Sequence, residues 1–456
     1  MIVKNEQEML ADCLLSAATV VDEIIIGDTG STDNTIAIAK QFNARVVSIE
    51  WQDDFAAARN EVLQYAQGDY ILVLDADERL APKAAIAIKK AVEIGTIDCG
   101  MMPLHNASTV DATIDEILSG KNRLAEPTTL PRLLRRTDDL RWNGVVHESV
   151  GTWLQQQGRI SQLLDAPIIH LGYVDSIYEE RQKASRNLRL LTRRVEVDDS
   201  SMSRTYLGEA LLIEGKIEPA FQHLQTAWTS LRREITLKKS RPPAVNLATV
   251  LCTILLKKGL FDDVFKILKT LKNWGFQHPN LDYLQGQALE RLCLQKPVTL
   301  FRLLRQASHH YLAALAMDDI PLAEKRIPGV TSWATHERLV IVSLQLQDLH
   351  QAKQCLQVLQ KQRPNTLRTQ LSVLEYTIQQ KAYGNAFQLA QPLMKQIYPD
   401  SWVLASQIVL KMGLYDEART FCQEALSRTK NKFVEAHRMR LLTEVIETLK
   451  GVSGNN

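Results

Sequence analysis

The pattern of hydrophobic and polar positions changes near residue 175. Before it, short apolar runs such as Ile24–Ile26 and Ile71–Leu74 alternate with turn residues and helical spacing. Short continuous apolar runs are typical of buried parallel strands, and their alternation with helices indicates an α/β fold. After it, long stretches rich in Leu, Ala, Gln and Lys place apolar residues at helical intervals. We therefore predict an N-terminal α/β domain followed by an all-α region.

The all-α region contains an internal repeat. Three segments share its form: DLHQAKQCL at 348–356, AYGNAFQLA at 382–390 and GLYDEARTF at 413–421. Each carries an alanine early in a predicted second helix, where a small residue lets two helices approach closely, at about the interval of tetratricopeptide repeats. Weaker units lie around Gly215 and Gly259, with irregular joints at Pro242-Pro243 and near Pro328. Stacked hairpins present a concave surface, which either recognises an acceptor or partner or only stabilises or dimerises the chain.

The 456 residues exceed what one hydrophobic core normally serves. We predict an α/β domain at 1–175, a helical linker at 176–204, tetratricopeptide-like helical repeats at 205–450 and a disordered tail at 451–456.

Two apolar runs end in carboxylates. ILVLDADERL at 71–80 ends in Asp75 and Asp77, and IIIGDTGSTDNT at 24–35 places Asp28 at the tip of another predicted strand. Ligands of open α/β sheets bind beyond the carboxyl ends of strands, where paired aspartates offer the oxygen ligands that Mg²⁺ and Mn²⁺ prefer. Because Asp is also favoured at turns, the pair alone is a weak signal.

Six segments in order resemble the landmarks of family-two glycosyltransferases, and more narrowly of the bacterial subgroup with tetratricopeptide repeats after the catalytic domain. They are MIVKNE at 1–6, GDTGSTDNT at 27–35, WQDDFAAARN at 51–60, GDYILVLDADE at 68–78, WNGVVHES at 142–149 and IIHLGY at 168–173. Several ordered motifs carry more weight than any single one. The resemblance implies a Rossmann-like GT-A fold, a UDP- or GDP-sugar donor, a divalent metal (Mg²⁺ or Mn²⁺) and inversion at the anomeric carbon.

The resemblance also assigns roles to residues of the donor site. It makes Asp28 the nucleoside contact, and Asp75 and Asp77 the carboxylates that hold the metal and the diphosphate. Glu6 falls in the loop that lines the nucleotide pocket. Arg59 either faces the diphosphate or is a solvated helix residue.

An inverting transfer needs a group that takes the proton of the acceptor hydroxyl and a positive group that holds the leaving diphosphate. The resemblance points to His147 and Glu148, and we expect Glu148 to be the base and His147 to shape the site. Much of the family carries a Glu-Asp pair there, so the choice of base stays open. His170 resembles a histidine that completes the metal or diphosphate shell, and a hydrogen-bonded core histidine is the alternative.

The family usually carries a few apolar residues before MIVKNE that extend a central first strand, whereas this sequence begins at Met1. We expect a shortened strand to lose ladder hydrogen bonds, to expose its neighbours' edges and to weaken the nucleotide pocket.

The composition and net charge limit the classes of binding partner that the sequence supports. With 45% hydrophobic and 23% charged residues the chain is not disordered, and a net charge of +2 gives no case for nucleic acid. We interpret the basic clusters RLLRR at 132–136 and RQKASRNLRLLTRR at 181–194 as solvated helix faces, with a lipid-phosphate or polyanionic acceptor as the alternative. Six cysteines without C-x-x-C spacing indicate reduced thiols.

No segment has the length and apolarity of a membrane span, and the first ten residues do not resemble a signal peptide. We expect a cytoplasmic protein, with peripheral attachment to the inner face of the membrane left open. Its partners are a nucleoside-diphosphate sugar, a glycan, lipid or protein acceptor and a protein bound to the repeats. The main alternative is a non-catalytic scaffold with a degenerate sugar-transferase domain. A nucleotidyltransferase is a weaker one, because MIVKNEQEM lacks a Gly-rich triphosphate loop.

Overall fold

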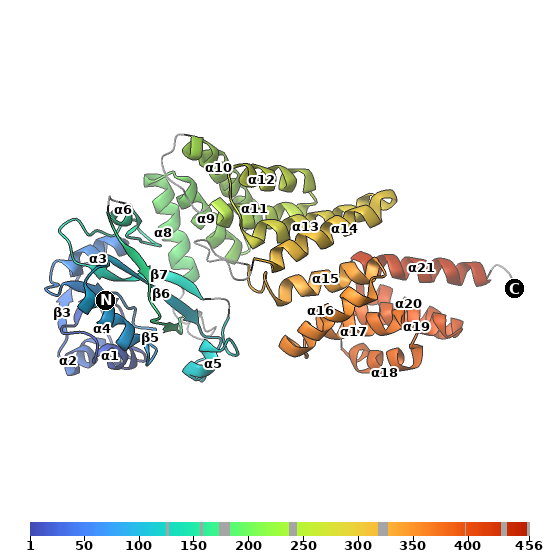
Figure 1. Ribbon diagram of the computed structural model, residues 1–456, viewed down its shortest axis with the longest axis horizontal. Coiled ribbons are helices and arrows are strands. Elements are labelled where there is room, and N and C mark those ends of the chain that lie inside the picture. The colour runs from blue at the N-terminus through green and yellow to red at the C-terminus, as the bar shows by residue number, and fades with distance from the viewer. Residues whose placement is uncertain are drawn as a thin grey trace. The chain divides into compact units, whose positions relative to one another are not determined.

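The computed structural model describes residues 1–124, 127–155, 158–172, 183–236, 244–317, 327–396, 398–429 and 436–453. The chain divides into two compact units, Met1–Leu247 and Ala248–Asn456. The first unit contains sheets flanked by helices, and the second contains only helices among its described residues (Figure 1). The predicted order of an α/β domain followed by helical repeats is therefore confirmed.

The first sheet has three parallel strands in the order β1-β2-β3. Its strands are β1 (Ile2–Val3), β2 (Ile25–Asp28) and β3 (Arg45–Ser48). Parallel strands need a crossover, which α1 (Leu10–Ala17) and α2 (Thr35–Gln41) provide. Val3 is the register partner of Asp28, so the carboxyl ends of β1 and β2 meet at one edge of the sheet.

The second sheet has the strand order β4-β7-β6-β9-β5, with β8 paired to β6. Its strands are β4 (Tyr70–Leu72), β5 (Glu78–Leu80), β6 (Cys99–Asn106), β7 (Thr128–Arg135), β8 (Ser161–Leu163) and β9 (Ile168–His170). The helices around it are α3 (Phe55–Leu63), α4 (Ala84–Ile94), α5 (Ile114–Leu118) and α6 (Gly151–Leu154). In the antiparallel β5–β9 ladder Glu78 is the partner of His170, which places β9 beside the acidic loop that follows β4.

Both β1 and β4 are edge strands. Among the described strands, β1 pairs only with β2, and β4 pairs only with β7. A cavity of about 230 Å³ is lined by residues of both strands, including Ile2 and Leu72. No backbone ladder joins the two sheets among the described strands, and apolar side chains connect them. Cys13 and Ala17 of α1, the helix between β1 and β2, lie in the same apolar cluster as Leu74, which follows β4.

Three helices complete the first unit: α8 (Lys183–Val197), α9 (Ser201–Ile213) and α10 (Ile217–Thr236). Leu190 and Leu191 of α8 and Leu207 of α9 are buried in one cluster with Val146. The helices α8 and α9 therefore pack against the α/β part of the chain. Gly215, with φ of 71°, makes the turn between α9 and α10 at a backbone conformation that favours glycine.

The remaining helices mostly pack against their neighbours in the sequence, as in helical hairpins. They are α11 (Ala244–Lys258), α12 (Phe261–Asn273), α13 (Pro279–Gln295), the 3-10 helix η1 (Pro297–Thr299), α14 (Leu300–Leu315), α15 (Trp333–Gln345), α16 (Leu349–Gln362), α17 (Leu367–Gln379), α18 (Tyr383–Met394), α19 (Pro399–Lys411), α20 (Tyr415–Thr429) and α21 (Ala436–Ser453). The repeat alanines Ala352, Ala386 and Ala418 are each 0% exposed, as close approach of paired helices requires.

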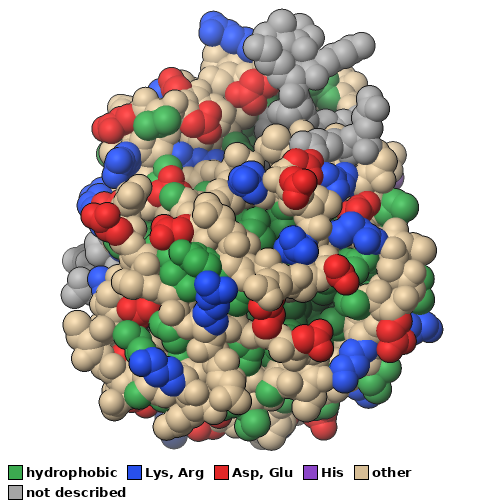
Figure 2. Space-filling model, turned by 90° about the vertical axis from the view of Figure 1, so that its left-hand side faces the viewer, with side chains coloured by type: hydrophobic (Ala, Val, Ile, Leu, Met, Phe, Trp, Pro, Cys, Tyr) green, Lys and Arg blue, Asp and Glu red, His purple; other side chains and the backbone are tan. Residues whose placement is uncertain are grey.

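Some predicted features lie outside the described residues, namely Tyr173, Pro242-Pro243, the start of the linker up to residue 182 and the tail residues 454–456. Helix α21 extends to Ser453, so the first residues of the predicted tail are helical. No helix in the described part of the chain is long and apolar enough to cross a bilayer. On the face drawn in Figure 2, acidic and basic side chains are interspersed, in agreement with the net charge of +2.

Candidate functional site

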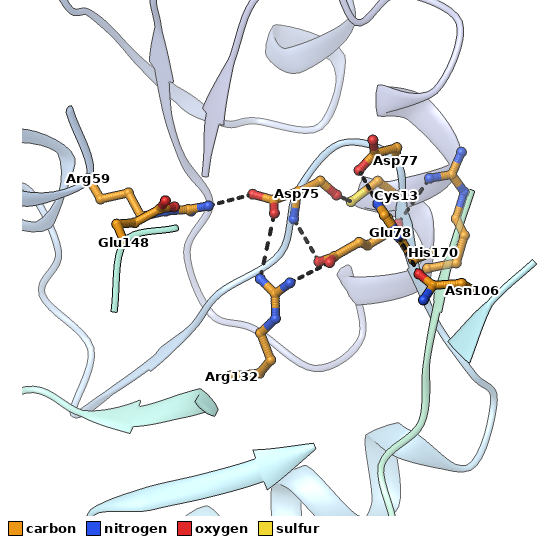
Figure 3. Close-up of polar contacts among 10 residues, drawn as sticks. Cys13, Arg59, Asp75, Asp77, Glu78, Asn106, Arg132, Glu148 and His170 are labelled. Atoms are coloured by element: carbon orange, nitrogen blue, oxygen red, sulfur yellow. Dashed lines mark hydrogen bonds and ion pairs between the residues drawn. The ribbon is translucent and has the colours of Figure 1, made fainter. Parts of the chain in front are cut away.

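The two carboxylates of the ILVLDAD run lie in the loop between β4 and β5. The Glu78 carboxylate accepts a hydrogen bond from the backbone N–H of Asp75 at 2.9 Å and thereby fixes this loop. Figure 3 shows that Asp75 faces Arg59 and Arg132, whereas Asp77 faces His170. Although only one residue separates them, the two aspartates have different partners.

Arg59 joins Asp75 to Glu148. Its Nη2 donates to Asp75 Oδ1 at 2.8 Å and its Nε donates to Glu148 Oε1 at 2.6 Å. The side chains of Arg59 and Glu148 are only 11% and 14% exposed. Helix α3 fixes the arginine, and Asp54 caps that helix by accepting from the N–H of Ala57 at 2.8 Å. Of the two interpretations of Arg59, the solvated helix residue is wrong, because the guanidinium is buried between two carboxylates.

The charge of Asp75 is stabilised from two sides. Burial raises the pKa of this carboxyl, but the guanidiniums of Arg59 and Arg132 outweigh burial and lower the pKa to about 2. Arg132 Nη1 lies 3.7 Å from Asp75 Oδ2. Burial lowers the pKa of Arg59, and the two carboxylates outweigh that effect and raise it. Asp75 is therefore ionised throughout the neutral range.

The sequence analysis missed two members of this cluster, Glu78 and Arg132. Both are buried, and Arg132 Nη2 donates to Glu78 Oε1. Burial raises the pKa of Glu78 to about 7, and the charge of Arg132 opposes this rise. Arg132 Nε has no hydrogen-bond partner among the described residues. For Glu78 the sequence offered a signal, because this residue is part of the DADE motif. For Arg132 the interpretation of RLLRR as a solvated helix face is wrong. The segment belongs to strand β7, which pairs with β4 and β6, and Arg132 is buried.

Asp77 and His170 form a second, smaller group. His170 Nε2 lies 3.6 Å from Asp77 Oδ1, and its Nδ1 lies 2.7 Å from Asn106 Oδ1. No group of three or more His, Cys, Asp or Glu side chains in the described residues has a metal-binding arrangement. Mg²⁺ and Mn²⁺ sites that complete their shell with substrate phosphates need only one or two protein ligands. Asp77 and His170 fit such an ion, while the oxygens of Asp75 face arginines.

Asp28 and Glu6 lie at the carboxyl edge of the first sheet. The Asp28 carboxylate accepts hydrogen bonds from the N–H groups of Gly30 and Ser31 at 3.0–3.2 Å, which shapes the turn after β2. The N–H of Glu6 donates to Thr35 Oγ1 at 2.7 Å and links the loops after β1 and β2. These bonds hold both residues at the rim of the sheet where the nucleoside contact is predicted.

His147 and Glu148 lie in a tight loop that Asn143 and Ser149 close with two backbone hydrogen bonds of 2.9 and 3.0 Å. Their side chains have different surroundings. Glu148 pairs with Arg59, whereas the exposed His147, at a left-handed φ of 52°, places its ring 4.5 Å from that of Tyr206 in α9. The Arg59 cluster, which consists of Arg59, Asp75, Glu78, Arg132 and Glu148, thus includes Glu148 but not His147 (Figure 3).

Comparison with known proteins shows what this chain is similar to. Residues 1–153 match the model described as glycosyl transferase family 2. A TPR repeat-containing protein of Synechococcus elongatus is 34% identical over 266 residues, which are 57% of this chain and only 60% of that protein. The SPbeta prophage-derived glycosyltransferase SunS of Bacillus subtilis is 24% identical over 352 residues, or 76% of each chain. A tetratricopeptide repeat protein of known structure from Parabacteroides merdae aligns with 12% identity and a TM-score of 0.40 over 59% of this chain and 94% of that one.

The matched residues include the acidic loop, Arg59, Arg132 and Glu148, so the family model covers every member of the Arg59 cluster. Only His170 of the predicted site residues lies beyond it. Residues 1–153 of this chain are therefore similar to glycosyl transferase family 2.

Proposed function

We propose that this chain transfers a sugar from a nucleoside-diphosphate sugar, a UDP- or GDP-sugar, to an acceptor hydroxyl with inversion at the anomeric carbon. The Arg59 bridge carries the proposal. It links Glu148, from the loop that follows Trp142, to Asp75 in the loop after β4. In this proposal one guanidinium binds both the base for the acceptor, Glu148, and a carboxylate of the donor site, Asp75, although the two residues lie far apart in the sequence.

In this reaction the acceptor oxygen forms a bond to the anomeric carbon while the bond from that carbon to the diphosphate oxygen breaks. Glu148 takes the proton of the acceptor hydroxyl, and the electron pair of the broken bond leaves with the nucleoside diphosphate. The positive charges of Arg59 and Arg132 lie beside the leaving group and stabilise its developing negative charge. The contact of His147 with Tyr206 supports Glu148, and not His147, as the base.

Asp77 and His170 are the residues that would hold Mg²⁺ or Mn²⁺, and the bound ion would neutralise charge on the diphosphate. Asn106 supports the metal role of His170, because a ligating histidine usually bonds its second ring nitrogen to a polar group. In this proposal Asp75 orients the two arginines, while Asp28 and Glu6 line the nucleoside part of the pocket.

The helical repeats supply recognition of the acceptor or of a partner protein. A stack of helical hairpins presents a continuous surface and carries no chemistry of its own. The acceptor is a glycan, lipid or protein hydroxyl that the enzyme reaches in the cytoplasm, either free or at the inner face of the membrane.

Calorimetric titration of UDP and then GDP, with and without Mn²⁺, tests the donor site. We expect one of the two nucleotides to bind with Mn²⁺, and Asp77→Asn to weaken that binding by about tenfold or more, because losing one of two protein ligands removes most of the site. Asp165→Asn is the matched control, since Asp165 is an exposed aspartate of the same unit.

Unchanged binding by the Asp77→Asn variant would remove Asp77 from the metal site. If the intact chain bound neither nucleotide at any Mn²⁺ concentration, the scaffold alternative would replace the proposed activity.

A further inference from the structure

We infer that Arg194 of α8 is a positioning residue, which holds the Gly144–Glu148 loop and so sets the place of the proposed base. This inference rests on the proposed function, in which Glu148 takes the acceptor proton. It assigns a role in the site to a helix that lies beyond the residues matched by the family model.

Arg194 is buried, with 5% exposure, inside the cluster predicted from sequence as a solvated helix face. That prediction is wrong for this residue. Its Nη1 donates to the carbonyl oxygen of Val146, and its Nε donates to Ser203 Oγ at 2.9 Å. The guanidinium also lies over the ring of Tyr206, at 5.6 Å from the centroid. These three contacts fix the position of the Arg194 side chain against the Gly144–Glu148 loop.

The loop is shaped to receive the guanidinium. Gly144 has φ of 101°, and a Cβ built on it would lie 3.0 Å from Arg194 Nη1 and 3.3 Å from its Cζ. A side chain at this position would be strained by the backbone and would press on Arg194. The glycine thus provides both the turn and the space that the arginine occupies.

The contact lies only two residues from the proposed base. Val146 accepts from Arg194, and Glu148 accepts from Arg59 Nε at 2.6 Å. Between them His147 adopts a left-handed conformation that side chains rarely take without support from outside the loop. On the other side, Val145 accepts from the N–H of Phe55 in α3 at 2.9 Å. The loop is therefore held between α3 and α8.

The test compares Arg194→Met and Arg194→Lys with Arg193→Met, a matched control on an exposed neighbour in the same helix. Hydrogen exchange of peptides covering residues 142–150 reports the loop. We expect exchange at least about tenfold faster in Arg194→Met, partial recovery in Arg194→Lys, and unchanged exchange in the control and in the second unit. Equal protection of this loop in all the variants would overturn the inference.

Turnover separates positioning from general damage. With UDP-glucose as donor and release of UDP as the readout, we expect Arg194→Met to lower kcat by about tenfold or more and to leave KM within about twofold, because the donor site does not contact Arg194. A parallel rise of KM and loss of UDP–Mn²⁺ binding would instead mean that the whole domain is disturbed. That outcome would contradict a positioning role.

Gly144→Ala attacks the same contact from the other side. We expect it to lower kcat as Arg194→Met does, and the double variant to lose less than the sum of the two single losses, since both changes disturb the same contact while the alanine also strains the backbone. Losses that add in full would show that the two residues act independently and would overturn the inference. If the wild-type chain releases no UDP, UDP-glucose is not its donor, and hydrogen exchange still decides whether Arg194 holds the loop.

Discussion

Arg59 donates to two carboxylates that have different tasks in the proposed reaction. A guanidinium presents its N–H groups in a rigid fork and can hold both, whereas the ammonium group of lysine is a point charge on a flexible stem. The relative place of Asp75 and Glu148 therefore depends on the shape of this side chain as well as on its charge.

We expect Arg59→Lys to lower turnover by about tenfold to a hundredfold, although the charge is kept, because one lysine cannot orient both carboxylates. Arg59→Met should be less active still and should unfold at a lower temperature. Steady-state kinetics and thermal unfolding check this, with the exposed Arg45→Lys as the control. Full activity of Arg59→Lys would show that the bridge has no directional role.

In the second unit, the buried carboxylate of Glu375 in α17 lies beside His437 and the guanidinium of Arg438. Its Oε2 lies 3.2 Å from His437 Nε2 and from Arg438 Nη2. Burial raises the pKa of this carboxyl, but His437 and Arg438 outweigh burial and lower it to about 2, compared with 4.5 for a free glutamate.

A lowered pKa in the folded state means that the unfolded chain takes up the proton first as the pH falls. The stabilisation from Glu375 is therefore present above about pH 4.5 and is lost as the pH falls towards 2. We expect Glu375→Gln to lower the free energy of unfolding at pH 7 by about 3 kcal/mol, because it removes the carboxylate that faces His437 and one of the two carboxylates that pair with buried Arg438, the other being Asp400.

The difference in unfolding free energy between the wild type and Glu375→Gln should shrink between pH 4.5 and pH 2. Denaturant unfolding over this range, followed by circular dichroism, measures it. A difference that does not change with pH would contradict the assigned ion pairs.

At the scale of single elements, the sequence predicted those features that depend only on residues close to one another in the chain. The apolar run before Asp75, the turn after Asp28 and the alanines of the hairpins are local patterns, and the structure contains each of them. Arg132 was misplaced because its partner Glu78 lies 54 residues away, and only strand pairing turns it inward. The bond from Arg59 to Glu148 spans 89 residues, so no local pattern predicts it.

The helical hairpins depend on small residues where paired helices meet. Ala352 of α16 is 0% exposed, and its neighbour Lys353 is exposed. We expect Ala352→Leu to destabilise the second unit by about 1–3 kcal/mol, because the added atoms must displace well-packed neighbours. Lys353→Leu, which adds a leucine on the open side of the same helix, should change stability by less than about 0.5 kcal/mol. Thermal and urea unfolding compare the two variants.

At the scale of the whole molecule, the compact unit that holds the site extends well beyond the matched family residues, to Leu247. Leu190 and Leu191 of α8 are each 1% exposed and share their cluster with Val146 of the loop that carries Glu148. The boundary predicted at residue 175 would separate these contacts from the site.

We therefore expect a chain of residues 1–236 to fold and to bind nucleotide like the full chain. A chain of residues 1–175 should unfold at a temperature lower by about 10 °C or fail to fold, because it exposes the apolar cluster around Val146. Circular dichroism and calorimetry of the two chains provide the measurement. Equal melting temperatures would mean that α8 and α9 contribute nothing to the stability of the domain.

The second unit is tied together by ion pairs between helices of successive hairpins. Glu290 of α13 accepts from Arg338 of α15, and Glu337 of α15 lies 3.4 Å from Arg368 of α17. Stability in such an array is spread over neighbouring contacts, so damage at one hairpin reaches mainly the hairpins beside it.

The edge strands β1 and β4 mark a boundary between the two sheets of the N-terminal unit, which we call the seam. Asp28 and Glu6 lie on the side of the three-stranded sheet, whereas Asp75 and Asp77 follow a strand of the other sheet, and no backbone ladder joins the two among the described strands. A nucleotide that contacts residues of both sheets would hold them together across this seam. Contacts on both sides would contribute to the affinity, so a saturating nucleotide would raise the melting temperature and would link the two sheets at the same time.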